Sequence, residues 1–154
     1  MKTFEELKEE LLNRAKNANA CQNGYKMGLD AKNKADLLKA ITANWFWVLI
    51  DARIVDAIYL EENFTEEELS EAGIYTRKCH EVRAVSFACG SATVKACGSA
   101  TVKACDSATV RACDESYVED CTGNIRPRYD YAIVKDYHNH KIYIRKGKFE
   151  IIEV

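Results

Sequence analysis

The sequence has no hydrophobic run long enough to cross a lipid bilayer. Its most apolar stretch is Trp45 to Ile50 with its flanks, whereas a membrane-spanning helix needs about 20 apolar residues. The first residues, MKTFEELKEELL, are charged and amphipathic, and they do not show the basic and then continuously apolar pattern of a signal peptide. We therefore expect a cytoplasmic protein that does not bind membranes.

The chain also has little net charge. Twenty-two lysines and arginines stand against 24 aspartates and glutamates, which gives a formal net charge of −2. This balance excludes a global basic field that would attract nucleic acid or an anionic membrane. The 154 residues are enough to bury a core without disulfides or metals, and an odd count of seven cysteines favours reduced thiols.

The first half of the chain predicts helices. Thr3 and Glu6 form a T-x-x-E capping box before an apolar stripe of helical period, and Thr65 and Glu68 repeat the capping pattern. The expected elements are a helix from the first box to residues 17–19, a short helix over 21–29, one buried helix over 35–51 and a short helix from the second box to about Ala72.

From residue 84 to residue 121 the sequence has a period of eight. The units read AVSFACGS, ATVKACGS, ATVKACDS, ATVRACDE and SYVEDC. In each unit six residues can be extended, and Gly-Ser or Asp-Ser can form a corner. Such an internal repeat decides the fold.

Two folds could use these units. An antiparallel meander with two-residue turns would leave no face consistently apolar, and strand register depends on such a face. In a β-solenoid every Ala-Val-Ala set points inward, while residues such as Thr93, Lys95 and Cys97 point outward. Because lysine cannot occupy a dry interior, the pattern favours a flat two-sheet roll with two units per coil.

The C-terminal stretch predicts a cap for this roll. Residues 131–137 and 141–145 alternate apolar and polar side chains around an HNHK turn, and a further turn at Gly147 precedes residues 149–154. The predicted fold class is therefore α+β, with a helical region over 1–80, the β-solenoid over 81–122, and a β-hairpin and final strand over 123–154 that cover the open end.

The A-T-V-[KR]-A-C-[GD]-S units resemble the Ala/Val-rich octapeptide repeats of phage and prophage accessory proteins. The stretch YAIVKDYHNHKIYIRKGKFEIIEV also looks like their closing segment, although the position of Cys97 and Cys105 is more often Tyr in those proteins. The resemblance covers about half of the chain. It implies a mobile-element context and no activity, and no functional residue carries over.

Metal and cofactor sites are not expected. Two units per coil would stack the repeat cysteines in two ladders, but a straight row on a flat sheet suits tetrahedral metal binding poorly, and no C-x-x-C spacing occurs. Cysteine also packs well as a small hydrophobe. His138 and His140 could share a strand face near Asp136, but an exposed hairpin turn accounts for them more simply.

We predict no enzymatic activity, because nothing places a nucleophile beside a base and GSATVK lacks the phosphate-loop spacing. The leading interpretation is a mobile-element protein whose rigid roll binds a host protein, with inhibition of a bacterial defence system as one role. The alternative is a nucleic-acid-binding accessory protein, and an oligomer is compatible with both. The candidate binding residues are basic or aromatic: Lys95, Lys103, Arg111, Arg126, Arg128, Tyr129, Lys141 and Arg145.

Overall fold

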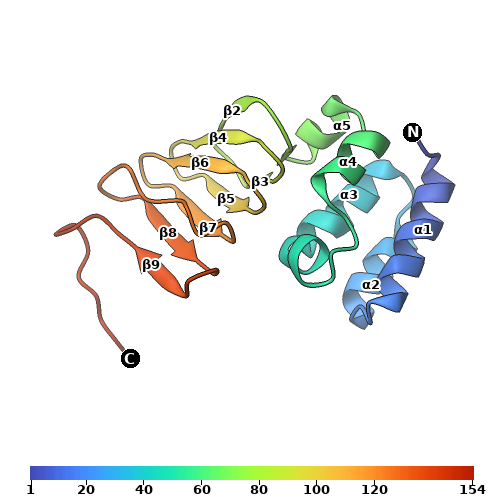
Figure 1. The fold of residues 1–154 in the computed structure, drawn as a ribbon, viewed down its shortest axis with the longest axis horizontal. Coiled ribbons are helices and arrows are strands. Elements are labelled where there is room, and N and C mark those ends of the chain that lie inside the picture. The colour runs from blue at the N-terminus through green and yellow to red at the C-terminus, as the bar shows by residue number, and fades with distance from the viewer. The chain divides into compact units, whose positions relative to one another are not determined.

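A computed structural model describes residues 1–154 and divides the chain into two compact units, Met1–Ile74 and Tyr75–Val154. The first unit is helical (Figure 1). Its elements are α1 (Phe4–Asn17), α2 (Gln22–Asp30), α3 (Lys34–Ala43), the π-helix η1 (Trp47–Asp51), α4 (Ala57–Asn63) and α5 (Glu66–Glu71). Both predicted capping boxes are present, at the first residues of α1 and α5. The core of this unit includes the fully buried Leu7, Trp45, Leu60 and Phe64.

The prediction of one helix over residues 35–51 is wrong, because the helix is interrupted at Asn44. The Asn44 backbone N–H donates to the Ile41 carbonyl at 3.2 Å, and its side-chain Nδ2 donates to the Ala40 carbonyl at 2.9 Å. The side chain thus satisfies the carbonyl that a regular helix would bond through the backbone, which is how asparagine competes with helix geometry. After Asn44, Trp45 and Phe46 are again helical, and the chain then continues as the π-helix η1.

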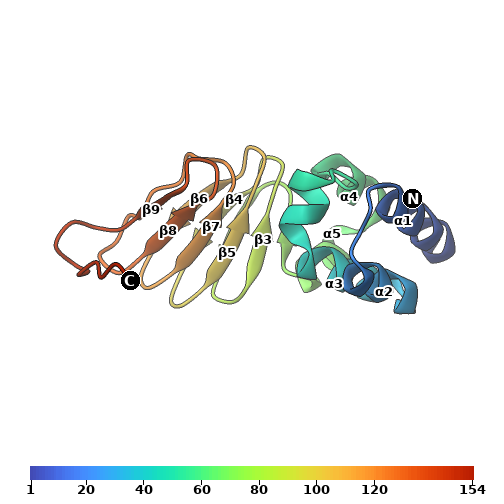
Figure 2. The ribbon, with the colours of Figure 1, turned by 90° about the horizontal axis from the view of Figure 1, so that it is seen from below.

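The second unit is a β-roll. Its strands lie side by side in Figure 2, in one sheet of order β1-β3-β5-β7-β8-β9 and another of order β2-β4-β6. The strands are β1 (Ile74–Tyr75), β2 (Cys79–Val82), β3 (Ser86–Ala88), β4 (Thr93–Ala96), β5 (Thr101–Ala104), β6 (Thr109–Ala112), β7 (Tyr117–Asp120), β8 (Ile133–Asp136) and β9 (Lys141–Tyr143).

The register confirms the solenoid and rules out the meander. β4 and β6 are parallel, with Thr93 opposite Thr109, and β5 and β7 are parallel, with Val102 opposite Val118. Each partner lies 16 positions further along the chain, so one coil contains two octapeptides. The predicted inward alanines and valines are buried and form one apolar core.

Backbone geometry at the corners explains why each corner begins with glycine or aspartate. Gly90, Gly98, Asp106 and Asp114 all have φ between 50° and 59°, a left-handed conformation that glycine, and less easily aspartate, adopts. The Asp106 carboxylate accepts a hydrogen bond from the Gly90 N–H at 3.1 Å, and Asp114 accepts one from Gly98 at 2.7 Å. Each aspartate therefore ties its corner to the corner of the preceding coil.

The expectation that the repeat cysteines point outward is wrong. Cys89, Cys97, Cys105 and Cys113 are buried, with at most 3% of their surface exposed. Each follows the last strand residue and lies at the corner, where the in–out alternation of a strand no longer applies. Equivalent corners stack through backbone bonds such as Cys105 N–H to the Ala88 carbonyl at 3.0 Å, so neighbouring coils cover the thiols.

The C-terminal hairpin is confirmed, but the final strand is not. β8 extends the roll by one more parallel step, with Val134 opposite Val118, and β9 is antiparallel to β8. Residues 149–154 form no strand and are exposed. The adjacent Ile151 and Ile152 break the alternation that would give this segment a buried face.

Candidate binding surfaces

The eight predicted binding residues do not form one surface. Two of them, Lys95 on β4 and Arg111 on β6, lie on the three-stranded sheet, whereas Lys103 lies on β5 of the six-stranded sheet. The others lie near the C-terminal end of the roll: Arg126, Arg128 and Tyr129 between β7 and β8, Lys141 on β9, and Arg145 after β9.

The outer side of the three-stranded sheet carries a regular array of exposed polar side chains. The register places Thr93 beside Thr109, and aligns Glu81, Lys95 and Arg111 in a row. We call the set Thr93, Lys95, Thr109 and Arg111 the threonine–cation face; all four residues are exposed.

The charge of this face is unbalanced. Glu81 is the carboxylate of the row, and its oxygens lie 3.6 Å from Lys95 Nζ and 3.3 Å from Arg83 Nη2. Arg111 forms no ion pair. One carboxylate on β2 therefore lies beside two cations, and Arg111 on β6 has no carboxylate partner.

The charged row on the outer side of the six-stranded sheet is ordered differently. It consists of Lys103, Glu119 and Lys135, so that the carboxylate lies between the two cations. The Tyr137 hydroxyl donates to Glu119 Oε2 at 3.0 Å, and Lys135 Nζ lies 4.7 Å from the centre of the Tyr137 ring. The hydrogen bond with Tyr137 raises the pKa of Lys135. The cations here are matched by local partners, so Lys103 does not extend the threonine–cation face.

Arg126 closes the end of the roll. Its guanidinium lies 3.8 Å from the centre of the Tyr143 ring, and Nη1 donates to the carbonyls of Gly123 at 3.2 Å and Ile125 at 2.8 Å. Tyr143 packs against the apolar core of the roll. Arg126 therefore contacts the capping aromatic ring while remaining exposed, and Arg128, Tyr129, Lys141 and Arg145 are exposed as well.

Two buried carboxylates were missed by the sequence reasoning. Asp120 and Asp136 occupy the inward position that alanine holds in the earlier coils, with Asp120 opposite Ala104. The oxygens of Asp120 accept from the N–H groups of Thr122 and Ile125 at 2.7 and 3.2 Å. The sequence did contain a signal for these buried carboxylates, because aspartate replaces alanine at an inward position of the octapeptide. It marks the two strands that are not followed by an ordinary corner: a longer loop follows Asp120, and a hairpin turn follows Asp136.

The second carboxylate organises the hairpin turn. Asp136 Oδ1 accepts from the N–H groups of His138 and Asn139 at 2.8 and 2.9 Å, and Oδ2 accepts from Asn139 Nδ2 at 2.8 Å. Burial by itself raises the pKa of Asp136, but the hydrogen bonds from Asn139 and His138 outweigh it, so the pKa lies below its ordinary value. The histidines of this turn are exposed, and no group of three or more potential metal ligands occurs in the chain.

We expect Asp136→Ala to destabilise the roll in a pH-dependent way. Removing the carboxylate leaves three donors, the N–H groups of His138 and Asn139 and the Asn139 Nδ2, without their acceptor. This loss should lower the free energy of unfolding at pH 7 by about 1–3 kcal/mol. Because the folded-state pKa is depressed, this contribution is fully present above the pKa of an unfolded aspartate, about 3.9, and is lost as the pH falls through the folded-state pKa. Urea unfolding at pH 7, 5 and 3 measures it.

The matched control is Asp130→Ala, because Asp130 is exposed and pairs with Lys148 at 3.2 Å on the surface. That change should cost less than about 1 kcal/mol. A difference between wild type and Asp136→Ala that stays constant from pH 7 to pH 3 would contradict this account of the buried carboxylate.

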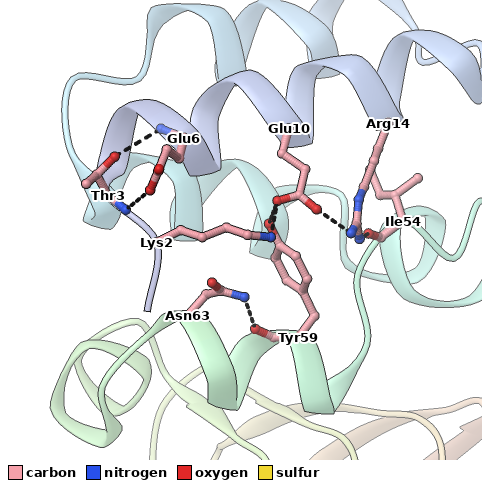
Figure 3. A network of polar contacts seen from close by, with 8 residues as sticks. All are labelled: Lys2, Thr3, Glu6, Glu10, Arg14, Ile54, Tyr59 and Asn63. Atoms are coloured by element: carbon pink, nitrogen blue, oxygen red, sulfur yellow. Dashed lines mark hydrogen bonds and ion pairs between the residues drawn. The ribbon is translucent and has the colours of Figure 1, made fainter.

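The helical unit contains one dense polar network, drawn in Figure 3. Glu10 accepts hydrogen bonds from Lys2 and Arg14, and the Tyr59 hydroxyl donates to its Oε2 at 3.4 Å. Arg14 also donates to the Ile54 carbonyl at 2.7 Å. Burial, and then the charge of Glu10, raise the pKa of Tyr59 to about 12. The network joins α1 to α4 and to the segment between η1 and α4.

These features define a β-roll repeat protein with a helical unit and a patterned polar face. None of its helices combines the length and apolarity that crossing a bilayer requires. No protein-family profile matches the chain, and neither does any curated protein or solved structure.

Proposed function

We propose that this chain is a non-enzymatic binding protein of a phage or mobile element, and that its threonine–cation face binds an acidic surface on a host protein. A component of a bacterial defence system is the proposed target. The observation that carries the proposal is the row in which Lys95 and Arg111 stand in register on a flat sheet, with Arg111 free of an ion pair. The mobile-element context comes from the resemblance of the repeats.

The rigidity of the roll supports this function. Parallel strands hold equivalent side chains about 4.8 Å apart, and each coil is tied to the next through both sheets and through the corner aspartates. Charges held at fixed spacing lose little conformational freedom when a partner binds. Such a surface favours partner selection through complementary charge.

The distribution of charge along the chain also supports it. Residues 75–154 carry 13 lysines and arginines against ten aspartates and glutamates, a net charge of +3. Residues 1–74 carry nine against 14, a net charge of −5. The excess of cations lies in the unit that contains the face, so an acidic partner suits the roll better than the helical unit.

A nucleic-acid-binding role is the second candidate, and it rests on other residues. Arg128, Tyr129, Lys141 and Arg145 remain exposed near the end of the roll, where cations and an aromatic ring could contact phosphates and bases. Arg126 is exposed as well, with its guanidinium stacked on Tyr143. We rank this candidate second, because its residues lie in loops and on β9 and are not in register on one sheet.

Two charge-reversal variants separate the candidates. Lys95→Glu/Arg111→Glu changes the threonine–cation face, and Arg128→Glu/Arg145→Glu makes the same change in charge at the end of the roll. Affinity capture from bacterial lysate should recover a protein partner after nuclease treatment, and only the face variant should lose it, by at least tenfold. The interaction should also weaken as salt is raised.

Loss of all bound material after nuclease, together with loss in the end variant alone, would establish the nucleic-acid role instead. A protein partner retained at wild-type yield by the face variant would overturn the proposed surface. Thermal unfolding of each variant checks that the exposed substitutions leave the roll folded.

A further inference from the structure

We propose that the helical unit contains a binding site for a small, uncharged, largely apolar molecule with one hydrogen-bond donor. The site is a cavity of about 410 Å³ bounded by α1, α2, α3, η1 and the segment after η1. Ligand sites typically have volumes of roughly 300–1,000 Å³, and an engineered apolar cavity of roughly 150 Å³ is enough to bind benzene. This inference is independent of the proposed function of the roll.

The chemistry of the walls selects the ligand class. Although 30% of the chain is charged, no charged side chain lines the cavity. Aliphatic side chains such as Leu12, Ile41 and Val48 form most of the walls, together with the rings of Tyr25 and Trp47. An ion would lose its hydration here without gaining a partner, so the fitting ligand is neutral.

Helix α2 leaves this space open. No residue of α2 is fully buried, and Gly24 and Gly28, about one turn apart, line the cavity. A Cβ atom at Gly24 would lie 3.2 Å from Asn44 Oδ1, and one at Gly28 would lie 3.3 Å from Leu12 Cδ2. The backbone of α2 therefore lies close to its neighbours at these two glycines. Because glycine has no side chain, the volume next to each of them stays unfilled.

Four polar side chains line the cavity: Asn19, Cys21, Tyr25 and Asn44. Of these, Asn44 has a fixed orientation, because its Nδ2 donates to the Ala40 carbonyl at 2.9 Å. This bond fixes the side-chain amide so that Oδ1 faces α2. A carbonyl oxygen held in this way can accept a hydrogen bond from a ligand hydroxyl or N–H.

A matched pair of fluorescent probes tests the site on the full chain. N-phenyl-1-naphthylamine is neutral, aromatic and has one N–H donor, whereas 8-anilino-1-naphthalenesulfonate is the same skeleton with a sulfonate. We expect saturable one-to-one binding of the neutral probe, with energy transfer from tryptophan, and at least tenfold weaker binding of the sulfonate. Equal binding of the two probes would overturn the proposal, because it would indicate adsorption to exposed apolar surface.

Two substitutions on one helix locate the bound probe. Ala40 lines the cavity, whereas Ala43 is exposed on the same helix and does not line it. Ala40→Phe should fill the space and weaken binding of the neutral probe at least tenfold, while Ala43→Phe should leave binding unchanged. Unaltered affinity in a folded Ala40→Phe variant would overturn the site.

A measurement on the unmodified chain keeps the test decisive even where a variant fails to fold. Cys21 lines the cavity and is exposed, and Cys79 is an exposed thiol in the other unit. A saturating concentration of the neutral probe should slow alkylation of Cys21 by iodoacetamide at least fivefold, with no change at Cys79, as measured by peptide mass spectrometry. Equal rates at Cys21 with and without probe would refute the location.

Discussion

Val102→Asp is expected to unfold the β-roll or to remove most of its stability. Val102 is fully buried between the two sheets, and burial of such a side chain contributes about 1.5–3 kcal/mol. An aspartate at this position would also place an unpaired carboxylate in an interior of alanine and valine, which costs several kcal/mol more. The combined loss is comparable to a total stability of roughly 5–15 kcal/mol, and urea unfolding measures it.

The control is the adjacent residue on the outer side of the same strand. Thr101 is half-buried and lies beside Tyr117, so Thr101→Asp should cost about 1 kcal/mol or less. A second pair, Val110→Asp and Thr109→Asp, repeats the comparison on the other sheet, where Thr109 is exposed. Because burial alternates along each strand, the valine change should lower the free energy of unfolding far more than the threonine change in both pairs. Equal costs for the valine and threonine changes would be incompatible with the inward and outward assignment.

Deletion of residues 131–154 is expected to cause aggregation. The deletion removes β8 and β9 and with them the buried Ala132 and Val134. The backbone of β7 would then present an unpaired edge beside an uncovered apolar core, which is the arrangement that leads to pairing between molecules. Size-exclusion chromatography with light scattering should show loss of the monodisperse species.

A shorter deletion separates capping from a general effect of truncation. Residues 149–154 pair with no strand and are exposed, so their removal should leave the size and the unfolding midpoint close to those of the parent chain. A chain lacking residues 131–154 that stayed soluble at the size of the parent would show that the hairpin does not cap the roll.

Much of the roll could be predicted because its pattern is short and repeated. An alternation of small apolar residues with threonine and lysine admits only one way to bury the apolar side, and the eight-residue period then implies two strands per coil. The capping boxes at α1 and α5 were equally accessible, because a cap depends on residues within one helical turn. The sequence by itself therefore determined the repeat architecture, the inward residues of the roll and the start of two helices.

The tertiary structure alone decided what depends on contacts between distant residues. Cys97 and its equivalents are buried because coils 16 positions apart stack at the corners, an effect that strand alternation does not describe. Burial, and then the charge of Glu81, raise the pKa of the Cys97 thiol.

The candidate site shows the same division. The basic residues are evident in the sequence, but their neighbours are set by register: Arg111 lies beside Lys95, Lys103 lies beside Glu119, and Arg126 stacks on Tyr143. Strand register and loop packing decide which of these cations also have a partner within the chain. The residue types were thus determined by the sequence, and their partners within the chain were decided by the packing of strands and loops.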